Sequence, residues 1–199
     1  MSLWAIDDCG AWAAALAGYA ATIAAQPGAG LVPLDTWYRQ TLPGTIGRRD
    51  PPFLTHDELV RVTEWKMRRG VWRERNRRLV AANPPAAVEE ASRAAFAAIP
   101  DLRRPVTLLA ALAGVGPATA SAMLAGVRPD LYPFFDEVVA RQIPGLGPVT
   151  FSAAYYQRYA ARLRERAAAL AAECAGAAWT AHDVSQALWA AAGGKADPR

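Results

Sequence analysis

Alanine-rich stretches with apolar residues at three- and four-residue spacing run through almost the whole chain. This spacing places apolar side chains together on one face of an α-helix. The alternating apolar and polar pattern that a half-buried strand would require is not found. The sequence therefore predicts an all-α protein of roughly ten helices, with no sheet and no internal repeat.

Helix-start and helix-stop signals divide these stretches. Thr55 and Glu58 form a capping box, in which the hydroxyl and the carboxylate each satisfy a free backbone amide, and the helix should end at about Arg69, before Gly70. Thr180 opens the last helix with a variant of this signal. Other helices are expected over about 9–25, 72–82, 86–98, 105–126 with a central glycine turn, from 136 onward and over 151–175, whereas breakers predict a loop over 42–53.

The chain of 199 residues is long enough to bury one core without covalent staples, so residues 1–199 are expected to form a single globular unit. Cys9 and Cys174 form no metal-spaced cluster and no disulfide framework, which favours buried thiols in an intracellular protein. His56 and His182 each lie at a helix start and match no zinc pattern. The net charge of +4 permits a polyanionic partner without requiring one.

The N-terminal residues do not resemble a targeting segment. Asp7 and Asp8 stand where a secretory signal would be basic, and the apolar run that follows is broken by Gly18 and Gln26. This run is too interrupted to span a membrane. A cytoplasmic protein is therefore expected.

The most informative segment places two glycines around one apolar residue, between an apolar helix and an alanine-rich helix. Gly114 and Gly116 permit a sharp reversal and leave no side chain to cover the backbone. Pro117 suits the first position of the following helix, where an amide hydrogen is not needed. Such a turn at a helix N-terminus is suited to a phosphate oxygen. An ordinary helix connection capped by glycine has the same pattern.

Leu112 to Gly116, followed by Thr119 and Ala120, resembles the helix-hairpin-helix of the DNA glycosylase superfamily, which includes endonuclease III, the adenine glycosylase MutY and the 3-methyladenine glycosylases. That family places its catalytic aspartate about twenty residues after the second hairpin glycine, and several members carry an arginine about five residues further on. Asp136 and Arg141 stand at these spacings. The resemblance implies a two-lobed helical glycosylase fold, with one lobe over 30–130 and a second formed by 1–29 and 131–199.

The resemblance also implies an activity, in which Asp136 is the catalytic residue of a DNA glycosylase, a hydrolase of base excision repair. A carboxylate beside the sugar stabilises the developing positive charge and orients the attacking water. Bifunctional members use a lysine two residues after the second hairpin glycine, and Ala118 at that position cannot form a Schiff base. The expected enzyme is monofunctional and has no AP-lyase activity. From the residues alone, Asp136 is equally well a helix N-cap.

The expected DNA contacts are the hairpin residues and two arginines: Gly114, Val115, Gly116, Pro117, Ala118, Thr119, Arg69 and Arg73. The arginines belong to the densest run of cations in the chain, residues 66–78, and guanidinium groups suit phosphates. A solvated helix face accounts for this run equally well. The expected partner is duplex DNA. The protein is expected to be a cytoplasmic monomer, which associates with the nucleoid if the source is bacterial.

Trp37 and Tyr38, on a short helical turn after Asp35, are candidates for the wall of a lesion pocket or for an inserted wedge. The segment over 59–67 is no counterpart of the helix rich in glutamine, serine and threonine that is typical of the lesion pocket in that family. The alternatives are a non-catalytic helix-hairpin-helix DNA-binding protein on the same scaffold, or an all-helical interaction protein in which Asp136 is only a cap. No iron–sulfur cluster, side-chain metal site or other cofactor is expected, although the resemblance allows an alkali cation on hairpin carbonyls.

Overall fold

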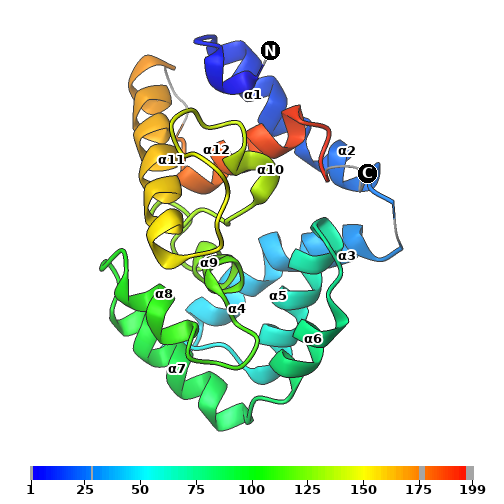
Figure 1. The fold of residues 1–199 in the computed structure, drawn as a ribbon, viewed down its shortest axis with the longest axis vertical. Coiled ribbons are helices and arrows are strands. Elements are labelled where there is room, and N and C mark those ends of the chain that lie inside the picture. Colours follow the sequence, from blue (N-terminus) through cyan, green and yellow to red (C-terminus); the bar gives the residue numbers. More distant parts are fainter. Residues whose placement is uncertain (1, 28, 175–177, 196–199) are drawn as a thin grey trace.

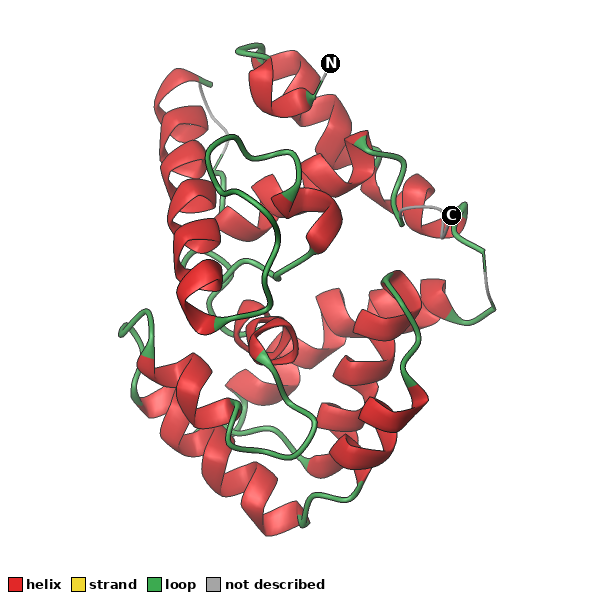
Figure 2. Ribbon diagram, viewed as in Figure 1, coloured by secondary structure: helices red, strands yellow, loops and turns green. Residues whose placement is uncertain are grey.

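The computed structural model describes residues 2–27, 29–174 and 178–195 (Figure 1). All regular secondary structure within these ranges is helical (Figure 2). The prediction of an all-α protein is therefore confirmed for the described part of the chain.

The helices follow one another with short connections. In chain order they are η1 (Leu3–Ala5), α1 (Cys9–Ala17), α2 (Tyr19–Ala24), α3 (Leu31–Thr36), the π-helical turn η2 (Trp37–Thr41), α4 (Leu42–Gly47), α5 (His56–Arg69), α6 (Glu74–Ala81), α7 (Pro85–Ala97), α8 (Arg104–Leu109), α9 (Pro117–Ala125), α10 (Glu137–Ala140), α11 (Ala153–Glu173) and α12 (Ala181–Ala191).

Both predicted capping signals form. At the start of α5, the Thr55 hydroxyl accepts from the Glu58 amide and the Glu58 carboxylate accepts from the Thr55 amide, while Arg49 binds that carboxylate with two nitrogens. Thr180 and Asp183 form the same reciprocal pair at α12. These boxes satisfy amides that a helix start leaves without partners, which fixes where the two helices begin.

The loop expected over residues 42–53 is wrong in its first half, because Leu42 to Gly47 form α4. Pro43 lies in the first turn of α4, where the missing amide hydrogen costs nothing, so it starts the helix instead of breaking it. The preceding helical segment also begins earlier than expected, at Leu31, and α3, η2 and α4 follow one another without a gap.

The two cysteines are joined in the structure, which corrects the expectation of unpaired thiols. Cys9 at the start of α1 and Cys174 at the end of α11 form a disulfide, with a Cα–Cα distance of 5.6 Å. Because the two residues lie 165 positions apart, only the packing of α1 and α11 on α12 brings them together. The expected cytoplasmic location rested in part on unpaired thiols, and this pairing removes that argument.

Helix α9 lies in the middle of the molecule. In Figure 1 it is viewed nearly end-on, with α1, α2, α10, α11 and α12 above it and α4 to α8 below it. It packs against α5, α8 and α11, and every residue from Ala118 to Ala125 is buried. Most of these side chains are small, so neighbouring helices approach closely on several sides. The turn that precedes α9 is therefore attached directly to a buried helix at the centre of the fold.

Among the described helices, none combines the length and the apolar character that crossing a membrane would need.

Candidate functional site

The glycine turn joins α8 to α9, as predicted. Gly114 has a φ of +72°, and a Cβ at this position would lie 2.9 Å from the Leu79 Cβ and 3.0 Å from the Asn76 carbonyl oxygen. Both the left-handed backbone and the close contact with α6 require glycine here. Val115, the residue between the two glycines, is buried in the core. The first half of the turn is therefore fixed by packing.

Asn83, which follows the end of α6, holds the turn from the side of that helix. Its Nδ2 donates to the Ala113 carbonyl and its Oδ1 accepts from the Ala113 amide, each at 2.9 Å. The side-chain amide thus bonds both backbone polar groups of Ala113. Asn83 also donates to the Val80 carbonyl at 2.8 Å and is buried, so it ties the end of α6 to the turn.

Gly116 differs from Gly114 in that nothing inside the fold requires it to be glycine. Its φ of −97° and ψ of −179° suit any residue, and a Cβ there would meet no atom within 4 Å. The amides of Thr119 and Ala120 donate to the Gly116 carbonyl at 3.0 and 2.9 Å. The amides of Gly116 and Ala118 have no acceptor among the described residues. The exposed N-terminus of α9 therefore carries unpaired donors and no covering side chain.

The structure separates the expected hairpin contacts into two groups. Gly116 is exposed, and Gly114 and Pro117 are half-buried. The side chains of Val115, Ala118 and Thr119 are buried and pack into the fold. Any contact that this turn makes with a ligand therefore comes from its backbone.

Asp136 caps α10, which confirms the capping interpretation. Its Oδ1 accepts from the Val138 amide at 2.9 Å, and its Oδ2 lies 3.5 Å from Nε of Arg69. The residue is only 9% exposed. Burial raises the pKa of the Asp136 carboxyl, and the nearby Arg69 charge offsets part of that rise. The carboxylate is thus engaged on both oxygens within the fold.

The segment that leads to Asp136 is held at successive peptide groups. Its backbone makes five hydrogen bonds to side chains: Tyr156 Oη to Pro133 O at 3.2 Å, Phe134 N to His182 Nδ1 at 3.3 Å, Tyr159 Oη to Phe134 O at 2.7 Å, Ser185 Oγ to Phe134 O at 3.4 Å and Phe135 N to Ser121 Oγ at 2.9 Å. These side chains come from α9, α11 and α12, so three helices fix the position of Asp136. Ser121 lies in α9, which links this segment directly to the helix that follows the glycine turn.

His182 is a neutral core residue. Because the Phe134 amide donates to Nδ1, that nitrogen carries no hydrogen, and the second ring nitrogen, Nε2, lies 3.0 Å from Nε2 of Gln186. Burial, with further effects of the Arg69 and Arg39 charges, lowers the pKa of His182 to about 3. The ring can accept the Phe134 hydrogen bond only while Nδ1 is unprotonated.

The structure corrects the assignment of Arg69 as a DNA contact. Arg69 is 1% exposed and lies among aromatic rings, with its guanidinium carbon 4.3 Å from the Trp189 ring centroid and 5.1 Å from that of Phe134. Its Nη1 donates to the Tyr19 hydroxyl at 3.3 Å, while Nε and Nη2 have no hydrogen-bond partner. Arg69 therefore serves as the buried counterion of Asp136 instead of reaching a phosphate.

A second buried carboxylate extends this network. Asp35 accepts from the Tyr19 hydroxyl at 2.8 Å and from the Trp65 indole at 2.9 Å. The chain Asp136–Arg69–Tyr19–Asp35 thereby crosses α10, α5, α2 and α3. Such a network fixes how these helices meet, because each group loses its partner if one helix shifts.

The other expected residues have different surroundings. Arg73 is exposed just before α6, next to the exposed Trp72. Tyr38 is 2% exposed, stacks on Trp65 at a centroid distance of 3.7 Å and donates to the Ala122 carbonyl. Tyr38 therefore belongs to the core and cannot act as an inserted wedge in this conformation. Trp37 is half-buried beneath the Arg61 guanidinium, which lies 4.0 Å from its ring centroid.

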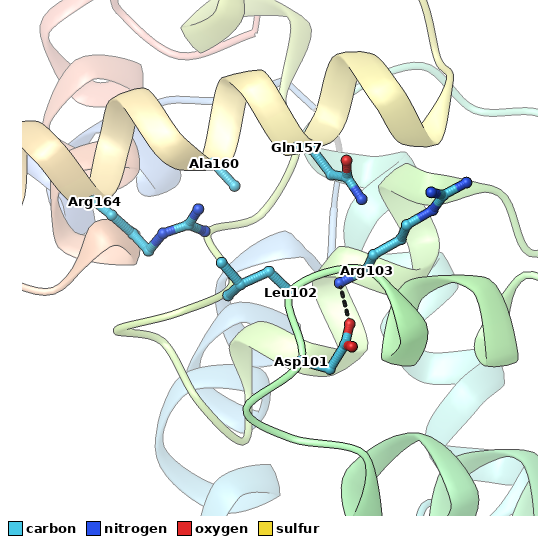
Figure 3. Close-up of a pocket in the computed structure, with 6 residues that line it drawn as sticks. All are labelled: Asp101, Leu102, Arg103, Gln157, Ala160 and Arg164. Carbon is cyan, nitrogen blue, oxygen red and sulfur yellow. Dashed lines mark hydrogen bonds between the residues drawn. The ribbon is translucent and has the colours of Figure 1, made fainter.

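Two surface hollows of about 410 Å³ each are formed by described residues, and Asp136 lines neither of them. In the first, Gln157 and Arg164 of α11 face the loop that carries Asp101 and Arg103 (Figure 3). The Asp101 carboxylate is already occupied there by the Arg103 amide at 2.7 Å. The second is lined by α6 residues next to the glycine turn: Glu74, Arg75, Arg78 and Leu79.

The described residues contain no group of three or more histidine, cysteine or acidic side chains that could hold a metal ion.

Comparison with known proteins yields one match. Residues 69–188 match a family of unknown function, DUF6308, and this range includes Arg69, the glycine turn, Asp136 and His182. No curated protein and no solved structure matches the chain.

Proposed function

Because the chain belongs to DUF6308, a family without a known activity, we propose from its geometry that it binds duplex DNA through the backbone of the glycine turn. The observation that carries this proposal is Gly116. Neither backbone conformation nor packing requires glycine at this position, yet a side chain here would cover the N-terminus of α9. The missing side chain is explained by a ligand that approaches the backbone closely.

The ligand that fits this end of α9 is a phosphate oxygen. The unpaired amides of Gly116 and Ala118 are hydrogen-bond donors, and the helix dipole places partial positive charge at the same end. Because backbone amides carry no base information, binding through them positions a duplex without reading its sequence. The expected binding is therefore weakly sequence-dependent and strongly salt-dependent.

The charge distribution around the turn supports a polyanionic partner. No aspartate or glutamate occurs between Asp101 and Asp130, and Arg103 and Arg104 stand exposed at the start of α8 in that stretch. On the α6 side, Arg75 is exposed on the helix that packs against Gly114. The turn itself carries no carboxylate, and exposed arginines lie on α6, which packs against Gly114, and at the start of α8, which leads into the turn.

For Asp136, the geometry favours the non-catalytic form of this scaffold. The carboxylate caps α10 and neutralises Arg69, so reaction with a sugar would require that ion pair to open. On the proposed scaffold, residues 30–130 form one lobe with the turn, and residues 1–29 with 131–199 form the second. The Asp136–Arg69 pair is then a structural contact between the lobes.

A second candidate function is removal of a damaged base by Asp136, and the observation in its favour is the rigid segment that carries it. Five hydrogen bonds from three helices hold the backbone that leads to this carboxylate more firmly than a helix cap needs. The mechanism would be hydrolysis without a covalent adduct, because Ala118 offers no amine.

The binding proposal is tested with Gly116→Asp and Gly116→Asn on fluorescence anisotropy of a labelled duplex. Both residues are good N-caps, so both variants should keep or slightly raise the melting temperature. We expect Gly116→Asp to weaken binding by about tenfold or more, because a carboxylate replaces a phosphate contact, and to lower the salt slope by about one. Equal affinities for the two variants would contradict binding at this turn.

The catalytic candidate is tested by incubating the protein with duplexes that carry single lesions and then adding alkali. Abasic sites formed by the parent and lost in Asp136→Asn would support base removal, provided that the variant still binds the duplex. A panel that yields no abasic sites, while the parent binds DNA, leaves the non-catalytic function. Borohydride trapping serves as a control and should give no adduct.

A further inference from the structure

A nine-residue segment of the glycine turn recurs later in the chain, contrary to the expectation of no internal repeat. Residues 114–122 read GVGPATASA and residues 145–153 read GLGPVTFSA. Both glycines and the proline are shared, as are the threonine, the serine and the final alanine. The first copy leads into α9 and the second leads to the start of α11.

The two copies also follow the same backbone path up to their first glycine. In the first copy, amides donate from Ala110 to Val106, from Ala111 to Leu108 and from Leu112 to Leu109; in the second, they donate from Arg141 to Glu137, from Gln142 to Val139 and from Ile143 to Ala140. Gly114 and Gly145 then take left-handed φ values of +72° and +81°. The equivalent apolar residues Val115 and Leu146 are both buried. The second copy thus repeats the first half of the turn in structure as well as in sequence.

The copies diverge at the second glycine. Gly116 is extended and Pro117 begins α9 at once, whereas Gly147 has a φ of +71° and the chain runs on to Ser152, which caps α11. The divergence leaves the second turn more open than the first. A Cβ on either Gly145 or Gly147 would meet no atom within 4 Å, and both residues are exposed.

Resting on the proposed function, we propose that the second turn, residues 145–148, is a further contact of this protein with the phosphate backbone of the same duplex. The amides of Gly145, Leu146 and Gly147 have no acceptor among the described residues. Like the first turn, the second therefore presents bare backbone donors on a support anchored by a buried apolar residue. Successive amides in such a turn form a concave site for an anion.

The surroundings of the second turn favour the same polyanion. No aspartate or glutamate lies between Glu137 and Glu165, and this stretch contributes four arginines. Arg158 is exposed above the Tyr155 ring, with a centroid distance of 5.4 Å, and the Tyr155 hydroxyl donates to the Gly147 carbonyl at 3.4 Å. A cation thus lies next to the residue that supports the turn.

Phe151 adds an apolar contact to this surface. It is 53% exposed, takes the repeat position of the buried Ala120, and leaves only part of its ring against Phe135, at a centroid distance of 5.3 Å. An exposed apolar ring beside cations offers a surface on which the deoxyribose rings of a duplex backbone can pack. Bare amides, arginines and one exposed ring are the combination expected for a DNA backbone.

The test compares Gly147→Asp with Gly147→Asn in the same anisotropy assay, with Gly193→Asp and Gly193→Asn as the matched control pair. Gly193, after α12, also has a positive φ, +78°, and an open Cβ position. The control therefore repeats the backbone strain and the charge change at a site outside the repeat. We expect Gly147→Asp to bind at least fivefold more weakly than Gly147→Asn, and the Gly193 variants to differ by less than twofold.

Equal binding of the Gly147 variants, while the Gly116 variants still differ, would overturn the second contact and leave the first in place. A parent protein that binds no duplex would overturn both. If a Gly147 variant does not fold, amide hydrogen exchange of the parent decides the matter without a substitution. Duplex DNA should then slow exchange in peptides that cover residues 145–148, and unchanged exchange in a saturated complex would refute the contact.

Discussion

Acidification should destabilise this protein through one buried histidine. The pKa of His182 is lowered from 6.5 to about 3 in the folded chain, because burial disfavours the charged ring. Below pH 6.5 the unfolded chain binds a proton that the folded chain refuses, so stability falls as the pH falls through this window. From pH 7 to pH 5 the loss is about 2 kcal/mol, and in a chain of this size it lowers the melting temperature by roughly 4–8 °C.

The assay is thermal unfolding of the parent and of His182→Gln between pH 7 and pH 5. The glutamine keeps a neutral polar side chain but does not titrate, so its melting temperature should change less over this range. The comparison removes the contribution of Asp136, whose raised pKa acts in the opposite sense, since its protonation favours the folded state.

Asp101 and Asp130 have lowered pKa values and contribute only at more acidic pH. Parallel pH profiles for the parent and His182→Gln would refute the assignment of His182 as a neutral core group. A profile that is steeper in the variant would refute it as well.

Four further substitutions test the support of the site, each by chemical denaturation. Gly114→Ala should destabilise the fold by about 2–4 kcal/mol, from left-handed strain and overlap with α6, whereas Gly116→Ala should be close to neutral; similar losses would contradict the contrast between the two glycines. Arg69→Met should cost about 3–5 kcal/mol at neutral pH, because Asp136 loses its counterion, and less in acid; a loss independent of pH would exclude the ion pair as its cause. Asn83→Ala should cost about 1–3 kcal/mol by leaving both polar groups of the Ala113 peptide unpaired, and a neutral result would show that the turn does not depend on this side chain.

Helix positions were predictable where local chemistry decides them. The capping boxes at Thr55 and Thr180 are complete in the sequence, and both helices begin where these signals place them. The breaker pattern predicts a loop where α4 forms, because a proline that breaks a helix interior also favours a first turn. Which interpretation holds depends on the continuous packing of α3, η2 and α4 against the core, which no local pattern contains.

The spacing of Arg69 and Asp35 relative to apolar residues indicates that both charges are buried. Leu59, Val62, Trp65 and Arg69 follow a three- and four-residue spacing, so Arg69 occupies the apolar face of α5. The dense run of cations around it, which includes Lys66 and Arg68, predicts phosphate binding instead. Asp35 likewise stands four residues after Leu31 and three before Tyr38, both buried. A charged residue at an apolar position of this kind indicates a buried partner, but only the fold identifies that partner.

Asp136 lies between the two copies of the glycine turn in the chain, and the segments on either side of it are joined to both copies. The segment before it is bound by Ser121 of α9, and α10 after it leads directly into the second copy. If both turns contact one duplex, the Asp136–Arg69 pair helps to hold them at a fixed separation, because it ties α10 to α5, which packs on α9. Removing the carboxylate would then weaken DNA binding with no chemistry involved. Loss of base removal in an Asp136 variant therefore counts as evidence of catalysis only where the affinity for the duplex is retained.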